Sequence, residues 1–560
     1  MVLSSFGRLF LVPRRRSQRG RRLAKPFENC AAEVLESRVL LAATLFVDPA
    51  STKPSVYHTI QAAVNAAPSG STIKVAPAVY DEDVTISQPV TILGGQVQLP
   101  GETGPSTVEF QSAGFTVSAN NVTIKGFTLE PNPDSTSAPP LLAILASNSS
   151  VDKFTNNIIN NSELMLGGGV TSTQVANNSG DFQIEVINAI SNADNSNDTF
   201  SANMITGGSI FLSDTATGAL LTGNTVQNGG GIENIADNVT FVNNTANNDG
   251  EGFTDFGGGT EIFTKNVADN NSDTGFDISA NGTVSLTNNS ATGNGTGIDV
   301  FGTGATTLLS NTANANTFLG IEVSGSSSPT LRQNTASNNL GTGFSVIGDS
   351  LTLVNNVADG DSEFGFQVSG GTVSIKGNTA DSAGETGFDI SVDSGAISGN
   401  TANDCVTAGF NVTSSAALSV TTNVASSNGE AGFQLSLDGG TVHGNTADAN
   451  QGSATDPNAG GFVISGSGIT ITNNVAQNNV ANGIALSSLT DSSLSGNTAT
   501  TNGNDGIFAD ANSTGNTLSK NKATGNTSFD LADDSTGSGT AGTANTWTKN
   551  TANKTNPPGL

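Results

Sequence analysis

Acidic residues recur at matching positions of consecutive repeats. Asp277, Asp299 and Glu322 each stand between two apolar residues, 22 and 23 residues apart, and Asp389 holds the same position further along. If the repeats stack as neighbouring strands about 4.8 Å apart, like charges raise the pKa of a carboxyl group or attract a cation such as Ca²⁺. Neighbouring carboxyl groups could also divide acid and base work on a glycosidic bond. The alternative is solvated surface charge, which is favoured by the polar residues that continue the series: Ser345, Gln367, Asn411 and Gln434.

A second group of candidates comprises one arginine and three further acids. Arg332 is the only arginine after residue 38 and shares its repeat position with Leu309, Val354 and Lys376, a mixed set typical of an exposed strip. Near the C-terminal end, oxygen ligands for Ca²⁺ could come from Asp530, Asp533 and Asp534. With two His and two Cys in 560 residues, the chain lacks the ligand set of a zinc, copper or haem site. We expect no cofactor other than, at most, Ca²⁺.

The chain between residues 241 and 527 is a repeat array. An Asn-x-Ala step occurs thirteen times from Asn244 to Ala523, mostly every 22 or 23 residues, with an apolar residue three positions before each Asn. Gly followed by two apolar residues at period two comes about ten residues later, as in Gly275-Phe276-Asp277-Ile278. These are short strand patterns separated by turn residues, and no segment of the array shows helical periodicity.

A unit of this size cannot bury its own apolar face, so the units must stack. Short strands stacked in this way form a parallel β-helix with one rung per repeat. The repeated Asn is predicted to adopt a left-handed turn conformation and to hydrogen bond along the stack through its side-chain amide. The Ala two positions later is predicted to lie at a tight corner.

Charge divides the chain into two kinds of segment. Residues 1–43 hold nine Lys or Arg and three acids, whereas residues 44–560 hold 11 basic and 45 acidic residues, a formal charge of −34. So acidic a body repels nucleic acid and anionic membranes, and we expect no nucleic-acid partner. No stretch of 18 uninterrupted apolar residues occurs, so no membrane span is expected.

The basic leader is followed by a short segment that suggests export. Leu35 to Ala43 combines charge, a short apolar run and small residues. This segment resembles the Leu-Glu-Pro-Arg-x-Leu-Leu segment at the N-termini of exported planctomycete proteins, with Ser37 in place of Pro. The resemblance implies a secreted or cell-surface location. The alternative is a disordered basic tail on a cytoplasmic protein.

Both ends of the repeat array carry residues suited to covering it. Ile60, Ala63, Val64 and Ala67 are spaced as in a short amphipathic helix, which would cover the first rung. Trp547, the only Trp, would cover the last core layer. We therefore predict five segments: a leader (1–43), an N-terminal cap and entry rung (44–83), irregular rungs (84–240), regular repeats (241–527), and a terminal rung with a C-terminal cap (528–560).

The strands from Gly70 to Gly94, with the repeats that follow, resemble the pectin-lyase-like β-helix superfamily. The resemblance implies an all-β fold, a single-stranded right-handed parallel β-helix with an N-terminal amphipathic helix cap. Members include polysaccharide lyases, hydrolases, esterases and epimerases as well as proteins without known catalysis, so the fold does not decide the function. We expect a structural, adhesive or carbohydrate-binding protein that contacts a polysaccharide or cell-envelope component. The alternative is an enzyme acting on an acidic glycan, with Asp277, Asp299, Glu322 and Arg332 as catalytic candidates.

Overall fold

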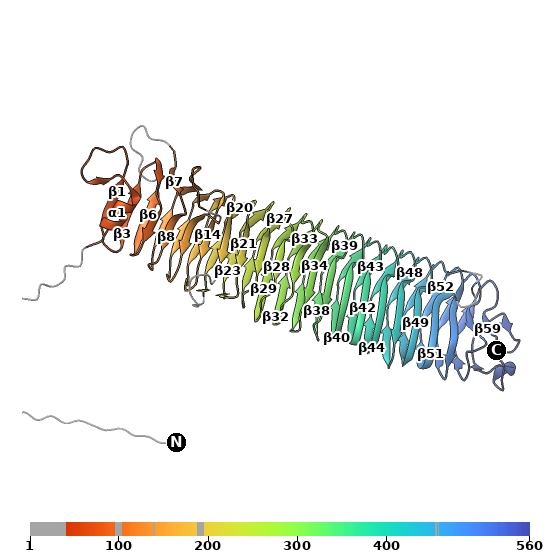
Figure 1. The fold of residues 1–560 in the computed structure, drawn as a ribbon. Helices are drawn as coiled ribbons and strands as arrows, with labels where there is room; N and C mark the ends of the chain where they lie inside the picture. The colour runs from red at the N-terminus through yellow and green to blue at the C-terminus, as the bar shows by residue number, and fades with distance from the viewer. Residues whose placement is uncertain (1–40, 96–103, 138–139, 188–194, 454–455, 457–458) are drawn as a thin grey trace, which may run out of the picture. The chain divides into compact units, whose positions relative to one another are not determined.

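A computed structural model describes residues 41–95, 104–137, 140–187, 195–453, 456 and 459–560. Contacts divide the chain into residues 1–41 and residues 42–560, and the second unit is a long stack of parallel strands (Figure 1). The basic leader lies outside the described residues, as does the predicted export segment except for its last three residues. No helix among the described residues is long and apolar enough to cross a membrane.

Each regular rung contains three strands that point the same inward residue types at the core. In one rung these are β31 (Thr274–Ile278), β32 (Thr283–Thr287) and β33 (Ser290–Thr292), with Phe276, Leu286 and Ala291 buried. We call the three sets of stacked strands the Phe strands, the Leu strands and the Ala strands. Each strand pairs in parallel with its equivalent in the next rung, and in the described part of the chain the ladder of the Ala strands contains 20 strands. The predicted parallel β-helix is confirmed.

The Phe strands used below begin as separate strands and later merge with the Leu strands. From β40 onward most run through the turn between the two sets, so that single strands reach 11 or 13 residues. The Phe strands named below are β31, β34 (Thr296–Phe301), β37 (Ile321–Ser324), β40 (Phe344–Val354), β42 (Phe366–Lys376), β44 (Phe388–Ser398), β46 (Phe410–Ser414), β49 (Phe433–His443) and β51 (Gly460–Thr472).

The repeated Asn forms a continuous hydrogen-bonded ladder inside the stack. The Asn334 Nδ2 donates to Asn356 Oδ1 at 3.0 Å and to the Leu308 carbonyl at 3.0 Å, and its Oδ1 accepts the Asn311 N–H at 2.8 Å. Side-chain bonds of 2.9–3.1 Å repeat this pattern in rung after rung. The first Asn ladder comprises Asn157, Asn178, Asn203, Asn224, Asn244, Asn266, Asn289, Asn311, Asn334, Asn356, Asn378, Asn400, Asn423, Asn445, Asn474, Asn497, Asn521 and Asn550. The predicted bonding along the stack is confirmed.

The prediction that this Asn itself takes the left-handed conformation is wrong. The residue directly before it has the positive φ, as at Asn243 (53°), Asn288 (56°) and Gln333 (56°). This division has a physical reason: the left-handed residue turns the chain, and the next residue then points its side chain inward, where an amide can bond to both neighbouring rungs.

The Ala of the Asn-x-Ala step lies in the middle of an Ala strand, so its predicted corner position is also wrong. Its small size is required by the glycine that precedes each Phe strand. A Cβ built on Gly275 would lie 2.6 Å from the Gly297 carbonyl oxygen, 2.8 Å from Asn294 Nδ2 and 3.1 Å from Ala291 Cβ. Backbone and Ala strand therefore approach too closely for larger side chains.

Aromatic rings add a second kind of stacking in the core. Phe344, Phe366, Phe388, Phe410 and Phe433 stack in sequence, with Phe462 as the sixth ring, at centroid distances of 4.7–4.8 Å and interplanar angles of 3–5°. This spacing equals the strand separation, so each ring is held parallel to its neighbours by the backbone pairing.

Caps close both ends of the stack. The helix α1 (Ile60–Ala66) buries Ile60, Ala63 and Val64, and the Glu82 carboxylate accepts the N–H groups of Ile60 and Gln61 at 2.8 and 3.0 Å. At the other end Trp547 pairs opposite Leu518, is 4% exposed, and donates its Nε1–H to Asp533 at 2.8 Å. Both predicted coverings are present, whereas the five segment boundaries stay predictions.

Removing one amide from the first Asn ladder tests its contribution to stability. We expect Asn334→Ala to lower the free energy of unfolding by about 2–4 kcal/mol, because the buried N–H and C=O groups that it serves lose their partners. Urea denaturation followed by circular dichroism measures this. The exposed Asn281 gives the matched control, with an expected effect of Asn281→Ala below about 0.5 kcal/mol. Equal effects of the two variants would contradict a structural role for the ladder.

Candidate functional site

The predicted acidic series forms one continuous column on the outside of the Phe strands. Strand pairing places Asp277 opposite Asp299, Asp299 opposite Glu322, and Glu322 opposite Ser345. We call this the outer column. It continues through Gln367, Asp389, Asn411, Gln434 and Val463, and extends backwards through Thr254, Glu233, Phe211 and Glu185.

Burial and like charge perturb two of these carboxyl groups. Partial burial raises the pKa of Asp277 to about 6, assisted by the charges of Asp299, Glu251 and Asp273. The pKa of Asp299 is likewise raised to about 6, by burial and then by the charge of Glu322. The column therefore holds groups that exchange protons in weakly acidic solution, which suits proton transfer or reversible binding of a cationic or hydroxyl-bearing ligand.

Arg332 lies apart from the outer column. It belongs to the Leu strand β38 (Thr330–Arg332), is exposed, and pairs opposite Leu309 and Val354 as the repeat alignment predicts. His443 occupies the same strip, and its Nδ1 lies 2.9 Å from Thr472 Oγ1. The geometry thus gives the acids of the outer column no basic partner from this strip.

The proposed Ca²⁺ ligands do not assemble into a metal site. Among the described residues, no group of three or more His, Cys, Asp or Glu side chains could hold a metal ion. Asp530 accepts the Asn526 Nδ2 at 3.0 Å and the Asn553 N–H at 2.8 Å, and Asp533 accepts bonds from Ser535 and Trp547. Those two carboxylates hold the C-terminal rungs together, while Asp534 is exposed.

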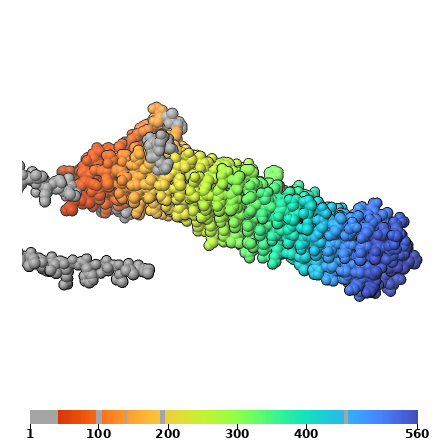
Figure 2. All heavy atoms as spheres, turned by 90° about the horizontal axis from the view of Figure 1, so that it is seen from below, coloured from red at the N-terminus to blue at the C-terminus, as the bar shows by residue number. Residues whose placement is uncertain are grey.

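Three surface hollows open along the Phe strands. The first has a volume of about 510 Å³ and lies beside Gln434 and Val463; the second, of about 270 Å³, lies beside Glu163 and Gln183; the third, of about 220 Å³, lies over Ser345, Gln367 and Asp389. All three are on the same strand set, and none of their lining residues is basic. Figure 2 shows one side of the stack, where the regular rungs form an even surface.

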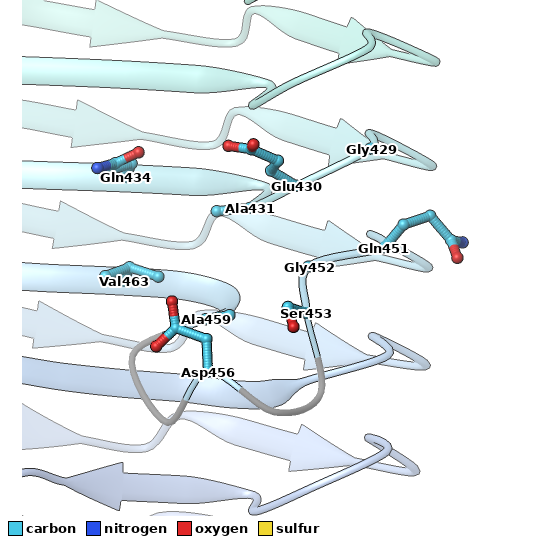
Figure 3. Close-up of a pocket in the computed structure, with 10 residues that line it drawn as sticks. All are labelled: Gly429, Glu430, Ala431, Gln434, Gln451, Gly452, Ser453, Asp456, Ala459 and Val463. Carbon is cyan, nitrogen blue, oxygen red and sulfur yellow. The ribbon is translucent and has the colours of Figure 1, made fainter.

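The first hollow combines two rungs with a longer turn. Glu430 and Gln434 line one side, and Asp456 directs its carboxylate toward Val463 from the other, whereas Gln451 points away (Figure 3). The lining residues that come from this longer turn are Gly452, Ser453, Asp456 and Ala459. Part of that turn lies outside the described residues.

The second hollow lies in the irregular rungs 84–240. It is lined by Glu163 and Asp181, with Pro140 at its edge. Burial, followed by the charge of the nearby Glu185, raises the pKa of Glu163 to about 7. A carboxylic acid that keeps its proton near neutral pH, beside other carboxylates, is the composition that acid–base chemistry requires.

Sequence reasoning did not single out Glu163, Asp181, Glu430 or Asp456. Glu163 and Glu185 stand at outward positions of period-two segments, Ser162 to Leu166 and Phe182 to Val186, and this alternation was the available signal. The irregular spacing of the rungs around them hid their alignment with the regular repeats.

Comparison with known proteins identifies a family of repeats. A family model described as "Right handed beta helix region" matches residues 230–380, 320–451 and 452–559, which together span more than half of the chain. This agrees with the parallel stack and supplies its handedness. No curated protein matches the sequence.

Solved structures with a similar course of the chain include three proteins that differ widely in sequence. Tailspike protein 3 of bacteriophage CBA120 has 12% identity and a TM-score of 0.22, over 85% of this chain and 56% of that one. The GH136 lacto-N-biosidase from Eubacterium ramulus has 11% identity and a TM-score of 0.29, over 53% and 65%. The PL6 family alginate lyase AlyGC has 10% identity and a TM-score of 0.24, over 91% and 100%. The chain spans about two thirds or less of the first two, and we base no argument on these similarities.

The coupling within the outer column can be tested by removing one charge. We expect Asp299→Asn to lower the pKa of Asp277 from about 6, because the variant removes the largest neighbouring charge. NMR titration of protein labelled with ¹³C at aspartate carboxyl groups measures the change. The exposed Asp349 serves as control, since Asp349→Asn removes a charge outside the column. An unchanged pKa of Asp277 in Asp299→Asn would show that the charge of Asp299 does not contribute to the shift.

Proposed function

Because the chain belongs to the right-handed β-helix family, we propose that it is an exported or cell-surface repeat protein that binds a polysaccharide along its Phe strands. Its role is structural or adhesive. The observation that carries this proposal is the placement of these three hollows on one strand set. Outer-column residues line two of them: Gln434 and Val463 in the first, and Ser345, Gln367 and Asp389 in the third. A polymer lying along the stack would contact successive rungs and so gain affinity from many weak contacts.

The side chains of this face suit hydroxyl groups. Carboxylates accept hydrogen bonds, and the amides of Gln367, Asn411 and Gln434 both donate and accept. Trp547 and Tyr80 are buried in the core, and the aromatic side chains on the outside of these strands include Phe211 of the outer column and the exposed Phe301 of β34. Binding therefore depends mainly on hydrogen bonds, and uncharged polysaccharides are preferred over polyanions because the hollows contain no basic lining residue.

Two sequence features support the extracellular location. The basic leader is followed by the export-like segment Leu35 to Ala43, and the body that follows has a formal charge of −34. High net charge of one sign keeps a long repetitive β-structure soluble and separate from other copies.

Catalysis is the second candidate, because of the perturbed acids. Glu163, with a pKa of about 7 beside Glu185, and Asp277 with Asp299, with pKa values of about 6, could each supply a proton donor and a base. The reaction would then be lysis, hydrolysis or epimerisation of a glycan, and an acidic glycan would need a divalent cation to approach this face.

Polysaccharide binding can be measured with a glycan array followed by calorimetry. We expect binding to an uncharged polysaccharide, and a loss of at least tenfold in affinity in the triple variant Asp277→Asn, Asp299→Asn, Glu322→Gln. The matched control carries Asp359→Asn, Asp381→Asn and Asp448→Asn, which remove the same number of charges from the outside of the Ala strands. Equal losses of affinity in both triple variants would show that binding depends on net charge and not on the outer column. Absence of binding on the array would leave a purely structural role.

Turnover separates the second candidate from the first. A screen of polygalacturonate, alginate and sulfated glycans, with and without Ca²⁺, is expected to show no product. Turnover that is lost in Glu163→Gln or in the outer-column triple variant, and retained in the Ala-strand control, would establish the enzyme instead.

A further inference from the structure

Hydrogen bonding by the Asn residues of the ladders follows one rule. Each Oδ1 accepts a backbone N–H from the preceding rung, and each Nδ2 donates to a carbonyl of that rung. Asn316, for example, accepts the Asn294 N–H at 2.9 Å and donates to the Ala291 carbonyl at 3.3 Å. It belongs to a second Asn ladder, which comprises Asn271, Asn294, Asn316 and Asn339 and, after an interruption at Ala383 and Cys405, Asn428, Asn450, Asn479, Asn502 and Asn526.

Aspartates replace asparagine at two positions of the second Asn ladder. Asp361 Oδ1 accepts both the N–H and the Nδ2–H of Asn339 at 2.9 Å, and Asp249 Oδ1 accepts the Gly229 N–H at 2.7 Å. Their Oδ2 atoms are buried and have no hydrogen-bond partner. By the register of the ladder, Asp361 Oδ2 takes the place of an Nδ2 that would donate to the Ala336 carbonyl.

The same replacement occurs at a different corner of the stack. Asp152 and Asp198 are each 1% exposed, and their Oδ1 atoms accept the N–H groups of Val122 and Thr173 at 2.8 and 2.7 Å. Again each Oδ2 is buried without a partner. Further along this inward column the residue is Asn516, whose Nδ2 donates to the Leu489 carbonyl at 2.7 Å.

An ionised carboxylate cannot make the missing bond. Its Oδ2 would face a carbonyl oxygen, with two acceptors in contact and a buried charge without compensation. The pKa of Asp361 is also affected by the charge of Asp359, and the pKa of Asp198 by the charge of Asp152; both neighbours are acids. The pKa values of Asp152 and Asp249 are affected by burial and hydrogen bonds alone. A protonated carboxyl group has an O–H donor and reproduces the Asn pattern.

We propose that Asp152, Asp198, Asp249 and Asp361 are protonated in the folded stack and donate their Oδ2 protons as Asn amides do, so that rising pH loosens the rungs that contain them. The stack thereby contains pH-sensitive hydrogen bonds at two separate corners, one with Asp249 and Asp361 and the other with Asp152 and Asp198. Asp249 and Asp361 lie in the second Asn ladder, next to Asn271 and Asn339. Asp152 and Asp198 lie in a column whose neighbouring members are Val122, Thr173 and Ala219 and which holds Asn516 further along.

The direction of the pH effect follows from linkage. Burial raises the pKa of Asp198 and of Asp361 to about 7, above the ordinary value of 3.8 that applies to the unfolded chain. Between these values the folded state binds more protons than the unfolded state, so stability falls as pH rises. Above about pH 7, the stabilisation from these protonated carboxyl groups is completely lost. These groups therefore stabilise the folded state most at acidic pH.

The test compares wild type with Asp198→Asn, Asp361→Asn and the double variant in thermal unfolding between pH 5 and pH 9. We expect the Tm of the double variant to change less with pH and to exceed that of wild type at pH 8–9. The control is Asp359→Asn, which removes an exposed charge next to Asp361 and leaves the ladder intact. A pH dependence unchanged in the double variant, or reduced equally by the control, would overturn the proposal.

A second measurement does not depend on stability. Infrared difference spectra of the folded protein should show the C=O band of buried protonated carboxyl groups at pH 6, with reduced intensity in the double variant. Hydrogen exchange at pH 9 should be fastest in the rungs around residues 173–198 and 339–361. Absence of the carboxyl band at pH 6 in wild type would likewise overturn the proposal.

Discussion

Parallel pairing of equivalent residues between rungs is the constraint on which this structure depends. It places every side chain about one strand spacing from the equivalent side chain of the next rung, and in the Asn ladders, the Phe stack and the Ala strands that side chain is of the same type. Asn amides, Phe rings and small Ala residues gain from this arrangement, because an amide bonds to its own kind and rings stack at 4.7–4.8 Å. Carboxylates do not gain, since like charges are brought together.

The treatment of acids therefore differs between the inside and the outside of the stack. On the outside, Asp277 and Asp299 are partly buried, and this burial, followed by the charges of neighbouring acids, raises the pKa of each to about 6. Inside, Asp361 occupies a position of the second Asn ladder, and Asp198 occupies a position that Asn516 holds further along the stack. In our proposal, a proton on each carboxyl group replaces the missing donor. The same pairing of equivalent residues thus underlies both proposals, polysaccharide binding on the outside of the stack and pH sensitivity of the buried carboxyl groups.

The hollows of the proposed binding face have different origins. The first lies beside a longer turn at Asp456 and the second in the irregular rungs at Glu163, whereas the third lies over regular rungs at Ser345, Gln367 and Asp389. The stack provides a long support, and the hollows provide local depressions on its surface. This arrangement matches a protein that contacts an extended polymer at several points.

By itself, the sequence determined the repeat length, the parallel stack, the outer column and the two caps, because a period of 22 or 23 residues and alternating apolar positions leave one way to bury the apolar faces. Only the tertiary structure decided the rest. The left-handed residue precedes the ladder Asn, Ala291 lies opposite the close approach at Gly275, and Glu163 meets Glu185 across irregular rungs. Each of these three features depends on distances between rungs, and the spacing of residues along the sequence does not specify such distances.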